Sequence, residues 1–361
     1  MATRLLRIVS PSVVLLVFFW ALGTTPDVPE PSEGQVSIEQ SRAWAEEADM
    51  LVRDGRAADA LGLLTQLNHA FPNNTIYIWN LAEAQRARGD YLAAAEFLEL
   101  YMDQSPVPWA ACPTIGDDYW SAGRLDEGLA SYQRCLDLEP SNPDYVLALG
   151  LANERLGHLR EAGVLFAEGE RLAADYADFQ IASGRLLIRT GQPHEAEKKL
   201  VAVLQQESES PDGLFALGLA LERQGRLGEA EDAYNAGLVL SPDNSDMVVG
   251  IARLRLRSGD AETARRLATE SLSRDPGSVD AMLIVAMALE RLNRLDAARG
   301  MAEQVIERSP TYGDAYLVLG RIAENQGRDS EALRLYDQLL EIQPDHPDAA
   351  KARARVGRGA E

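Results

Sequence analysis

The stretch GRLGEAEDAY, residues 225–234, recurs in degenerate form along most of the chain. Its glycine, Gly225, has counterparts at a constant spacing of 34 residues, and so does the small residue Ala230 that follows it. A third series with the same spacing consists mostly of proline and includes Pro242. A fourth consists entirely of glycine or alanine and includes Gly218. Four series with one period indicate a structural repeat rather than an isolated ligand loop.

The turn series marks the period most clearly. It comprises Gly55, Gly89, Gly123, Gly157, Gly191, Gly225, Gly259, Asn293 and Gly327. Glycine ends a helix readily because it adopts the left-handed conformation without steric cost, and asparagine is the next best residue there. Apolar residues recur at helical spacing on both sides of the turn, in 212–224 and 228–240. Each 34-residue unit is therefore predicted to contain two helices. The second helix ends at the proline, which cannot continue a helix.

This pattern resembles the tetratricopeptide repeat. One unit carries the resemblance on Leu214, Leu217, Gly218, Leu221, Ala230, Tyr234 and Pro242. It extends over nine consecutive units, 41–74, 75–108, 109–142, 143–176, 177–210, 211–244, 245–278, 279–312 and 313–346, and points to no particular subfamily. The resemblance implies an all-α fold, a right-handed α-solenoid of helix-turn-helix repeats whose first helices line the concave side. Residues 347–361 predict a polar capping helix and tail.

The N-terminal segment differs in composition from the rest. Arg4 and Arg7 precede an apolar run, and an acidic, proline-rich linker follows at 24–40. This order is typical of an export signal, so residues 1–23 are expected to be either a cleaved signal peptide or a retained membrane anchor. The repeats would then lie outside the cytoplasm, in a periplasmic or inner-membrane-anchored protein, with the linker as a tether.

Composition and motifs exclude several classes of function. The net charge of −21 argues against nucleic-acid binding, which needs clustered cations. The sequence has no phosphate loop, nucleophile elbow or zinc-protease motif, and its histidines lack metal-ligand spacing. We therefore expect neither catalysis nor a cofactor or metal, while the oligomeric state stays open.

The cysteines, Cys112 and Cys135, fall near the start of the first helix and the end of the second helix of the third unit. In an antiparallel pair that turns at Gly123, these positions are level with each other. A disulfide there suits an exported protein. The alternative is two buried thiols that merely pack.

Helical geometry predicts which residues of the first helices face the groove. If Leu214 and Leu217 face the partner helix, Phe215 and Leu219 lie one step further round, toward the groove. The predicted peptide-binding groove comprises Trp79, Trp120, Leu147, Leu151, Ile181, Arg185, Phe215, Leu219, Val249, Arg253, Leu283, Met287, Leu317 and Arg321. This surface is acidic and aromatic in the first repeats and apolar with arginines later, and it suits an extended or helical peptide.

A series of arginines near the ends of the first helices has two interpretations. It comprises Arg155, Arg189, Arg223, Arg257 and Arg291. Cations there favour the negative end of the helix dipole and cover apolar surface with their stems. The other interpretation is an anion-facing ladder.

These features predict a non-catalytic scaffold that binds a peptide or protein segment in its concave groove during assembly of a cell-envelope complex. Two alternatives remain: an adaptor for polysaccharide or lipid export, and a regulatory subunit of a glycosyltransferase or cofactor-maturation enzyme. The expected partner is a protein or peptide, and membrane contact would occur only through an uncleaved N-terminal segment.

Overall fold

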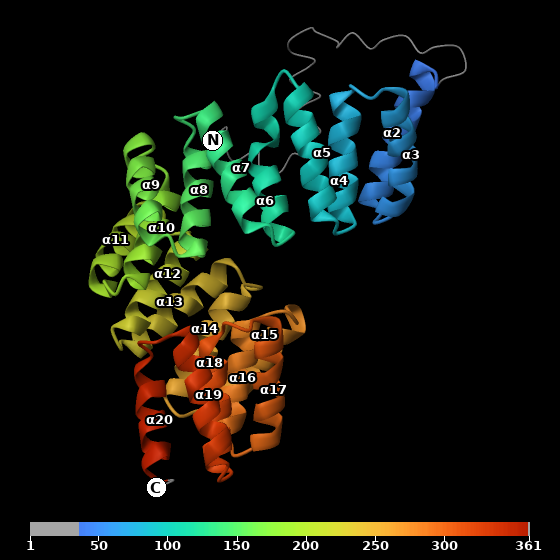
Figure 1. Ribbon diagram of the computed structural model, residues 1–361. Helices are drawn as coiled ribbons and strands as arrows, with labels where there is room; N and C mark the ends of the chain where they lie inside the picture. The colour runs from blue at the N-terminus through green and yellow to red at the C-terminus, as the bar shows by residue number, and fades with distance from the viewer. Residues whose placement is uncertain (1–35, 360–361) are drawn as a thin grey trace. The chain divides into compact units, whose positions relative to one another are not determined.

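The computed structural model describes residues 36–359, which are helical and contain no strand (Figure 1). The predicted signal or anchor at 1–23 and most of the linker at 24–40 lie outside the described residues. Within the described range, no helix has both the length and the apolar character needed to cross a membrane.

The chain divides into two compact units, one ending at Leu165 and the other beginning at Phe166. The first unit contains α2 (Ile38–Arg53), α3 (Ala57–Ala70), α4 (Thr75–Ala87), α5 (Tyr91–Gln104), the short 3₁₀ helix η1 (Pro108–Ala111), α6 (Cys112–Ser121), α7 (Leu125–Leu138) and α8 (Pro143–Leu156). The boundary falls within α9 (Leu159–Leu172).

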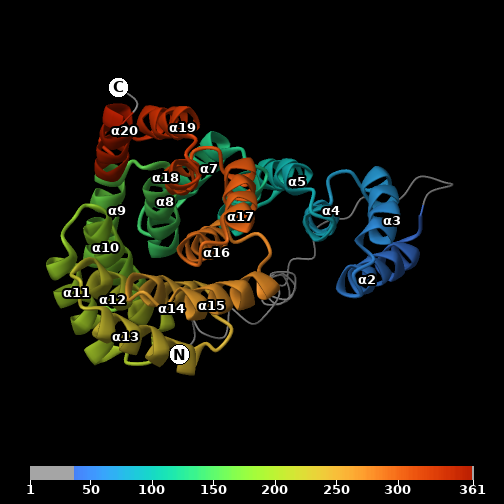
Figure 2. The same ribbon diagram turned by 90° about the horizontal axis from the view of Figure 1, so that it is seen from below.

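The second unit continues with a regular series of helices. They are α10 (Ala177–Arg189), α11 (Pro193–Gln206), α12 (Pro211–Arg223), α13 (Leu227–Leu240), α14 (Ser245–Arg257), α15 (Ala261–Arg274), α16 (Val279–Arg291), α17 (Leu295–Arg308), α18 (Gly313–Asn325), α19 (Asp329–Ile342) and α20 (Pro347–Gly359). Even-numbered helices are the first helices of the repeats and odd-numbered helices the second. Neighbouring first helices contact each other, for example α14 with α16 and α16 with α18, as can be followed in Figure 2.

The turn between the two helices of a repeat has the left-handed conformation that the glycine series predicts. Gly225 has φ 78°, and the amide of Arg226 donates to the carbonyl of Leu221 at 3.0 Å, which closes the C-terminus of α12. Asn293 has φ 59°, and no other residue except glycine has a positive φ in the described range. The prediction that asparagine substitutes for glycine at this turn is confirmed.

The aromatic residue of the opening stretch lies between two repeats. Tyr234 on α13 is fully buried against Gly218 of its own repeat and Gly250 of the next. A Cβ atom added at Gly250 would lie 2.9 Å from the ring, and one at Gly218 would lie closer still. The small residues on the first helices are therefore required by the ring of the second helix.

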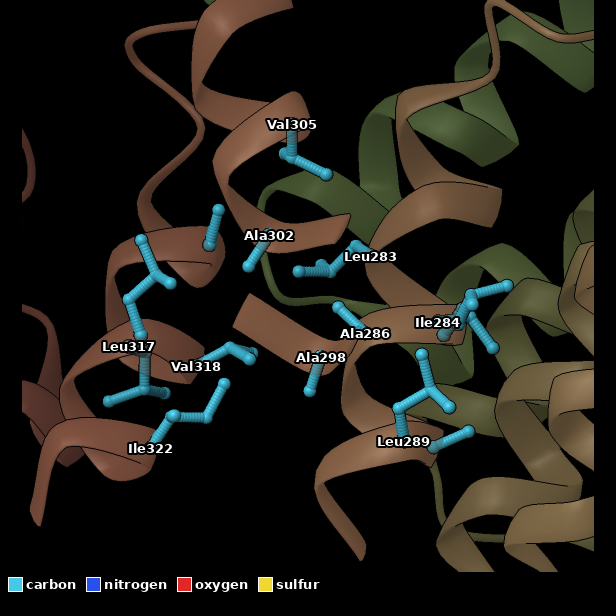
Figure 3. Packing of buried hydrophobic residues seen from close by; sticks show 14 of the residues in the cluster. Leu283, Ile284, Ala286, Leu289, Ala298, Ala302, Val305, Leu317, Val318 and Ile322 are labelled. Atoms are coloured by element: carbon cyan, nitrogen blue, oxygen red, sulfur yellow. The ribbon is translucent and has the colours of Figure 1, made fainter. Parts of the chain in front are cut away.

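The same principle appears in the core of α16, α17 and α18. Ala298 and Ala302 of α17 are fully buried. Figure 3 shows them between the larger side chains of α16, such as Leu283, and those of α18, such as Leu317. Small side chains on the second helix thus let the two first helices approach on either side.

Two glycine substitutions are expected to have opposite effects on stability. Gly218→Ala forces a methyl group against the buried ring of Tyr234 and should lower the free energy of unfolding by about 1–3 kcal/mol. Gly300→Ala, in the middle of α17 where the added Cβ has no atom within 4 Å beyond the adjacent residues and the helix's own backbone, should raise it by about 0.5–1 kcal/mol. Urea unfolding followed by circular dichroism measures both changes. If Gly218→Ala raises the free energy of unfolding as much as Gly300→Ala does, the packing around Gly218 is loose.

The third repeat departs from the regular pattern. Its first helix, α6, has 10 residues and is preceded by the 3₁₀ helix η1, which begins at Pro108. Proline is tolerated in a first helical turn but not beyond it, so the prolines of this segment delay the start of α6. The disulfide described below lies in this shortened repeat.

Candidate functional site

The predicted groove residues lie on the first helices, but their exposure differs. Those that stay half-buried at the surface are Trp120, Leu147, Leu151, Phe215, Leu219, Arg253, Met287 and Arg321, and Arg185 is exposed. Buried side chains are Trp79, Ile181, Val249, Leu283 and Leu317, with exposed fractions of 3%, 5%, 4%, 5% and 9%. The expectation that these five line a surface is corrected, because their side chains pack between helices.

Trp79 shows why an aromatic residue can be misassigned. It is on α4, and its ring meets that of Tyr101 on α5 edge to face, with centroids 5.1 Å apart. Both side chains belong to the core cluster around Ile78 and Ile115. The large ring is buried in this cluster and contributes to stability rather than to a partner surface.

Two of the three arginines of the predicted groove, Arg253 and Arg321, are paired with glutamates of the preceding repeat. Arg253 Nε on α14 donates to Glu222 Oε1 on α12 at 2.9 Å, and Tyr234 donates to the same carboxylate at 3.2 Å. Arg321 makes a bidentate pair with Glu290, with Nε to Oε1 at 2.8 Å and Nη2 to Oε2 at 2.6 Å. These guanidinium groups therefore join repeats and add no net positive charge to the face.

The last repeat is joined to the capping helix in the same way. Arg355 on α20 makes a bidentate pair with Glu324 on α18, with both nitrogen–oxygen distances at 2.8 Å. Tyr336 donates to this carboxylate at 3.1 Å, and the arginine holds the pKa of Glu324 below its ordinary value. We call a glutamate of one first helix paired with an arginine of the next first helix a clasp.

The second arginine series also contacts the preceding repeat. Arg257 and Arg291 donate to the backbone carbonyls of Glu222 and Leu256, at 3.2 Å and 2.9 Å, near the ends of α12 and α14. Arg155 lies over the ring of Trp120, 5.6 Å from its centroid. These contacts favour the helix-capping interpretation over an anion-facing ladder. All five arginines of the series are exposed.

Cys112 and Cys135 form a disulfide that joins α6 to α7, with their Cα atoms 5.4 Å apart. Tyr145 of α8 packs against this pair, and its hydroxyl donates to the carbonyl of Trp109 at 2.9 Å. The crosslink thus joins the two helices of the irregular third repeat, and Tyr145 connects this repeat to the next.

An apolar cleft that the sequence did not indicate lies in the first unit. It has a volume of about 750 Å³ and is walled by α7, α8 and α9, with Leu129, Leu136 and Leu149 in its lining. Val164 on its wall is 65% exposed. Periodicity alone could not reveal it, because these residues follow the same apolar pattern as those that bury themselves in other repeats.

The described residues carry no constellation suited to metal chemistry. Between residues 36 and 359, no group of three or more histidine, cysteine or acidic side chains could hold a metal ion. The first helices of the described residues present partly exposed apolar side chains beside charged ones.

Comparison with protein families agrees with the repeat pattern. A model described as tetratricopeptide repeat matches residues 45–107, 181–245 and 249–312, which together are more than half of the chain. A second tetratricopeptide repeat model matches 292–356, and a model described as TPR repeat matches 116–157. The matched stretches lie in both compact units.

A curated protein shares part of this sequence. The small glutamine-rich tetratricopeptide repeat-containing protein 2 of Mycosarcoma maydis is 27% identical over 143 residues, which are 40% of this chain and 40% of that protein. The chain therefore spans less than half the length of that relative.

Solved structures share the fold at low identity. The APC/C hetero-tetramer Cut9–Hcn1 is similar with a TM-score of 0.61 and 13% identity, over 88% of this chain and 63% of that chain. A tetratricopeptide repeat protein from Parabacteroides merdae has a TM-score of 0.57 and 16% identity, over 69% of this chain and 98% of that chain. The predicted all-α solenoid of helix pairs is confirmed.

Proposed function

Because the chain belongs to the tetratricopeptide repeat family, we propose that it is a non-catalytic scaffold that binds a peptide or protein segment on the face formed by its first helices. The observation that supports this most directly is the exposure of apolar side chains on that face. Phe215, Leu219 and Met287 stay partly exposed, whereas Val249 and Leu283 on the same series of helices are buried. Partly exposed apolar anchors beside charged groups suit a polypeptide ligand.

The cellular setting belongs to the same proposal. The protein is exported, either periplasmic or anchored in the inner membrane, and it contributes to the assembly of a cell-envelope complex. The basic, apolar and acidic order of residues 1–40 supports export. The disulfide between Cys112 and Cys135 supports an oxidising compartment.

Substitution of the apolar anchors tests the binding face. Replacing Phe215 and Leu219 together with aspartate should abolish capture of the partner from a native envelope extract, because two anchors become charged. Affinity capture followed by mass spectrometry measures the loss, and circular dichroism checks that helical content stays unchanged.

The second helices provide the matched control. Val239 on α13 is 80% exposed and Val201 on α11 is 38% exposed, so aspartate at both positions adds the same charge away from the proposed face. Capture should survive this change. Undiminished capture by the Phe215 and Leu219 variant would refute the assignment of the face.

A further inference from the structure

The apolar cleft of the first unit lies where other repeats are joined by ion pairs. Leu129 of α7 lines this cleft, and the equivalent residues of the second unit, at intervals of 34, include Glu197 and Arg299. Glu197 pairs with Arg226 at 2.6 Å and Arg299 pairs with Glu331 at 2.9 Å, so each joins its second helix to the next repeat. Leucine cannot form such a link. The second-helix side of α7 and α9 is therefore open and apolar.

An exposed valine stands beside this cleft. Val164 at the start of α9 is 65% exposed and belongs to the cleft wall. Its equivalent on α7, 34 residues earlier, is Ala130, which is also exposed and also lines the cleft. Leu125, 38% exposed, lies one turn before Leu129 on α7 and extends the apolar wall. Equivalent positions on the two helices thus carry a large side chain on one and a small side chain on the other.

The charges on the rim of the cleft differ between the two helices in the same way. Arg160 of α9 and Asp126 of α7 are equivalent residues, four positions before Val164 and Ala130, and both are exposed. Within residues 36–359, the side chain of neither forms an ion pair or a hydrogen bond. A cation in the first turn of a helix opposes the helix dipole, so α9 itself gives no reason for the sign of Arg160.

A third charge on the rim has the same sign on both helices. Glu161 follows Arg160 and is exposed, and its equivalent on α7 is Glu127. The carboxylate of Glu127 is paired with Arg124, which precedes α7. The charge at this position on α7 is therefore already compensated.

A two-fold axis parallel to the helices brings the complementary positions together. Because α7 and α9 are second helices of successive repeats, they run in the same direction and their equivalent residues lie level with each other. Rotating a second copy by 180° about such an axis sets α7 of each copy against α9 of the other. Large then meets small, and positive meets negative, twice over, as an interface between identical patches requires. The chain itself supplies both members of each pair, which favours a second copy over an unrelated partner.

We propose that the second-helix face of α7 and α9 is an interface between two copies of this chain, related by a two-fold axis parallel to these helices. Val164 of each copy packs over Ala130 in the cleft of the other, and Arg160 of each copy pairs with Asp126 of the other. The two α7 and two α9 helices form a four-helix bundle with crossing angles of about 20°. The first-helix face stays free, so this inference goes beyond the proposed function and does not depend on it.

Disulfide crosslinking between two variants of the full chain tests the proposal. One variant carries Ala130→Cys and the other carries Val164→Cys. Disulfides form where Cα atoms lie about 4.4–6.8 Å apart, so an equimolar mixture under mild oxidation should yield a covalent dimer that reductant separates. Each variant alone should yield far less, because identical positions lie diagonally across the bundle. The matched control mixes Ala130→Cys with Val239→Cys, since Val239 on α13 is 80% exposed and lies on another second helix. This mixture should stay monomeric on a denaturing gel.

Charge reversal tests the ion pairs separately. Arg160→Asp sets like charges against each other and should weaken self-association by roughly threefold to tenfold, because exposed ion pairs are individually modest. Adding Asp126→Arg exchanges the signs and should restore the wild-type dissociation constant. Sedimentation equilibrium of the full chain measures both changes.

An aspartate on the cleft wall should abolish the dimer. Val164→Asp places a charge in the apolar cleft of the other copy, whereas Val239→Asp adds the same charge away from it and should leave self-association unchanged. Both side chains are exposed, so both variants should fold, as circular dichroism will check. Wild-type protein that stays monomeric, equal crosslinking in the two mixtures, a dimer that survives Val164→Asp, or no rescue by the charge exchange would each overturn the proposed interface.

The outcomes also separate this inference from the proposed function. Val164→Asp should capture the native partner as the wild type does, since the first-helix face is untouched. The variant with aspartate at Phe215 and Leu219 should remain dimeric. Each interface can therefore fail without the other.

Discussion

Replacing Glu222 with leucine should lower the free energy of unfolding by about 2–3 kcal/mol. The carboxylate is 9% exposed and accepts hydrogen bonds from Arg253 and Tyr234. Its removal leaves a buried hydroxyl and a guanidinium without their acceptor. Because Arg253 keeps 33% of its side chain exposed, the loss falls below that of a fully buried pair. Urea unfolding followed by circular dichroism measures it.

The chain itself supplies the compensating change for this variant. Two other pairs of adjacent repeats carry apolar residues at the positions of the clasp. These pairs are Ile188 with Leu219 and Leu256 with Met287. An apolar pair and an ion pair are thus alternative ways to join neighbouring first helices, which accords with the small net stabilisation that buried ion pairs bring over well-packed apolar ones.

A triple variant, Glu222→Leu with Tyr234→Phe and Arg253→Met, should therefore recover most of the loss, to within about 1 kcal/mol of the wild type. It removes both hydrogen-bond donors, Tyr234 and Arg253, that the single variant leaves without their acceptor. If the triple variant is as unstable as Glu222→Leu alone, the loss comes from misfitting volume, and the clasp is not the cause.

Reduction of the disulfide should lower the stability of the first unit by about 3 kcal/mol. Cys112 and Cys135 are 23 residues apart in sequence, and closing a loop of this length restricts the unfolded chain by about that free energy. Urea unfolding with and without reductant measures the change, and a Cys112→Ala with Cys135→Ala variant should show no response to reductant.

The oxidation state in the cell can be measured directly. Protein isolated from its native cells without reductant and treated with an alkylating reagent should gain mass only after reduction. Two thiols that react without reductant would instead support the alternative interpretation, in which the cysteines merely pack.

Local backbone chemistry explains why so much of the fold was predictable from the sequence. Gly225 and Asn293 occupy the left-handed turn that their residue types favour, and both have positive φ. The position of Tyr234 against small residues follows from the same alignment of repeats. Each of these features depends on a residue and its immediate neighbours in the repeat, so one period of the sequence was sufficient to reveal them.

The candidate site was less predictable because exposure depends on neighbouring repeats. Phe215 and Val249 occupy equivalent positions, yet the first is partly exposed and the second buried. Arg253 was expected to present its charge at the groove, but it is paired with Glu222. Whether an apolar side chain is exposed, or a charge is unpaired, depends on the residues of the adjacent repeat that pack against it. Those residues lie about one repeat away in sequence.

The sequence by itself determined the repeat, the helix pairs and the turns, because a constant period and the conformational limits of glycine, asparagine and proline act locally. Tertiary structure alone decided which side chains of the first helices remain available. Packing of each first helix against the next buries Val249 and Leu283 and pairs Arg253 with Glu222, while it leaves Asp212 and Asp246 exposed. The net charge of the candidate surface is therefore a property of assembled repeats, since it is set by distances between helices that a single repeat does not contain.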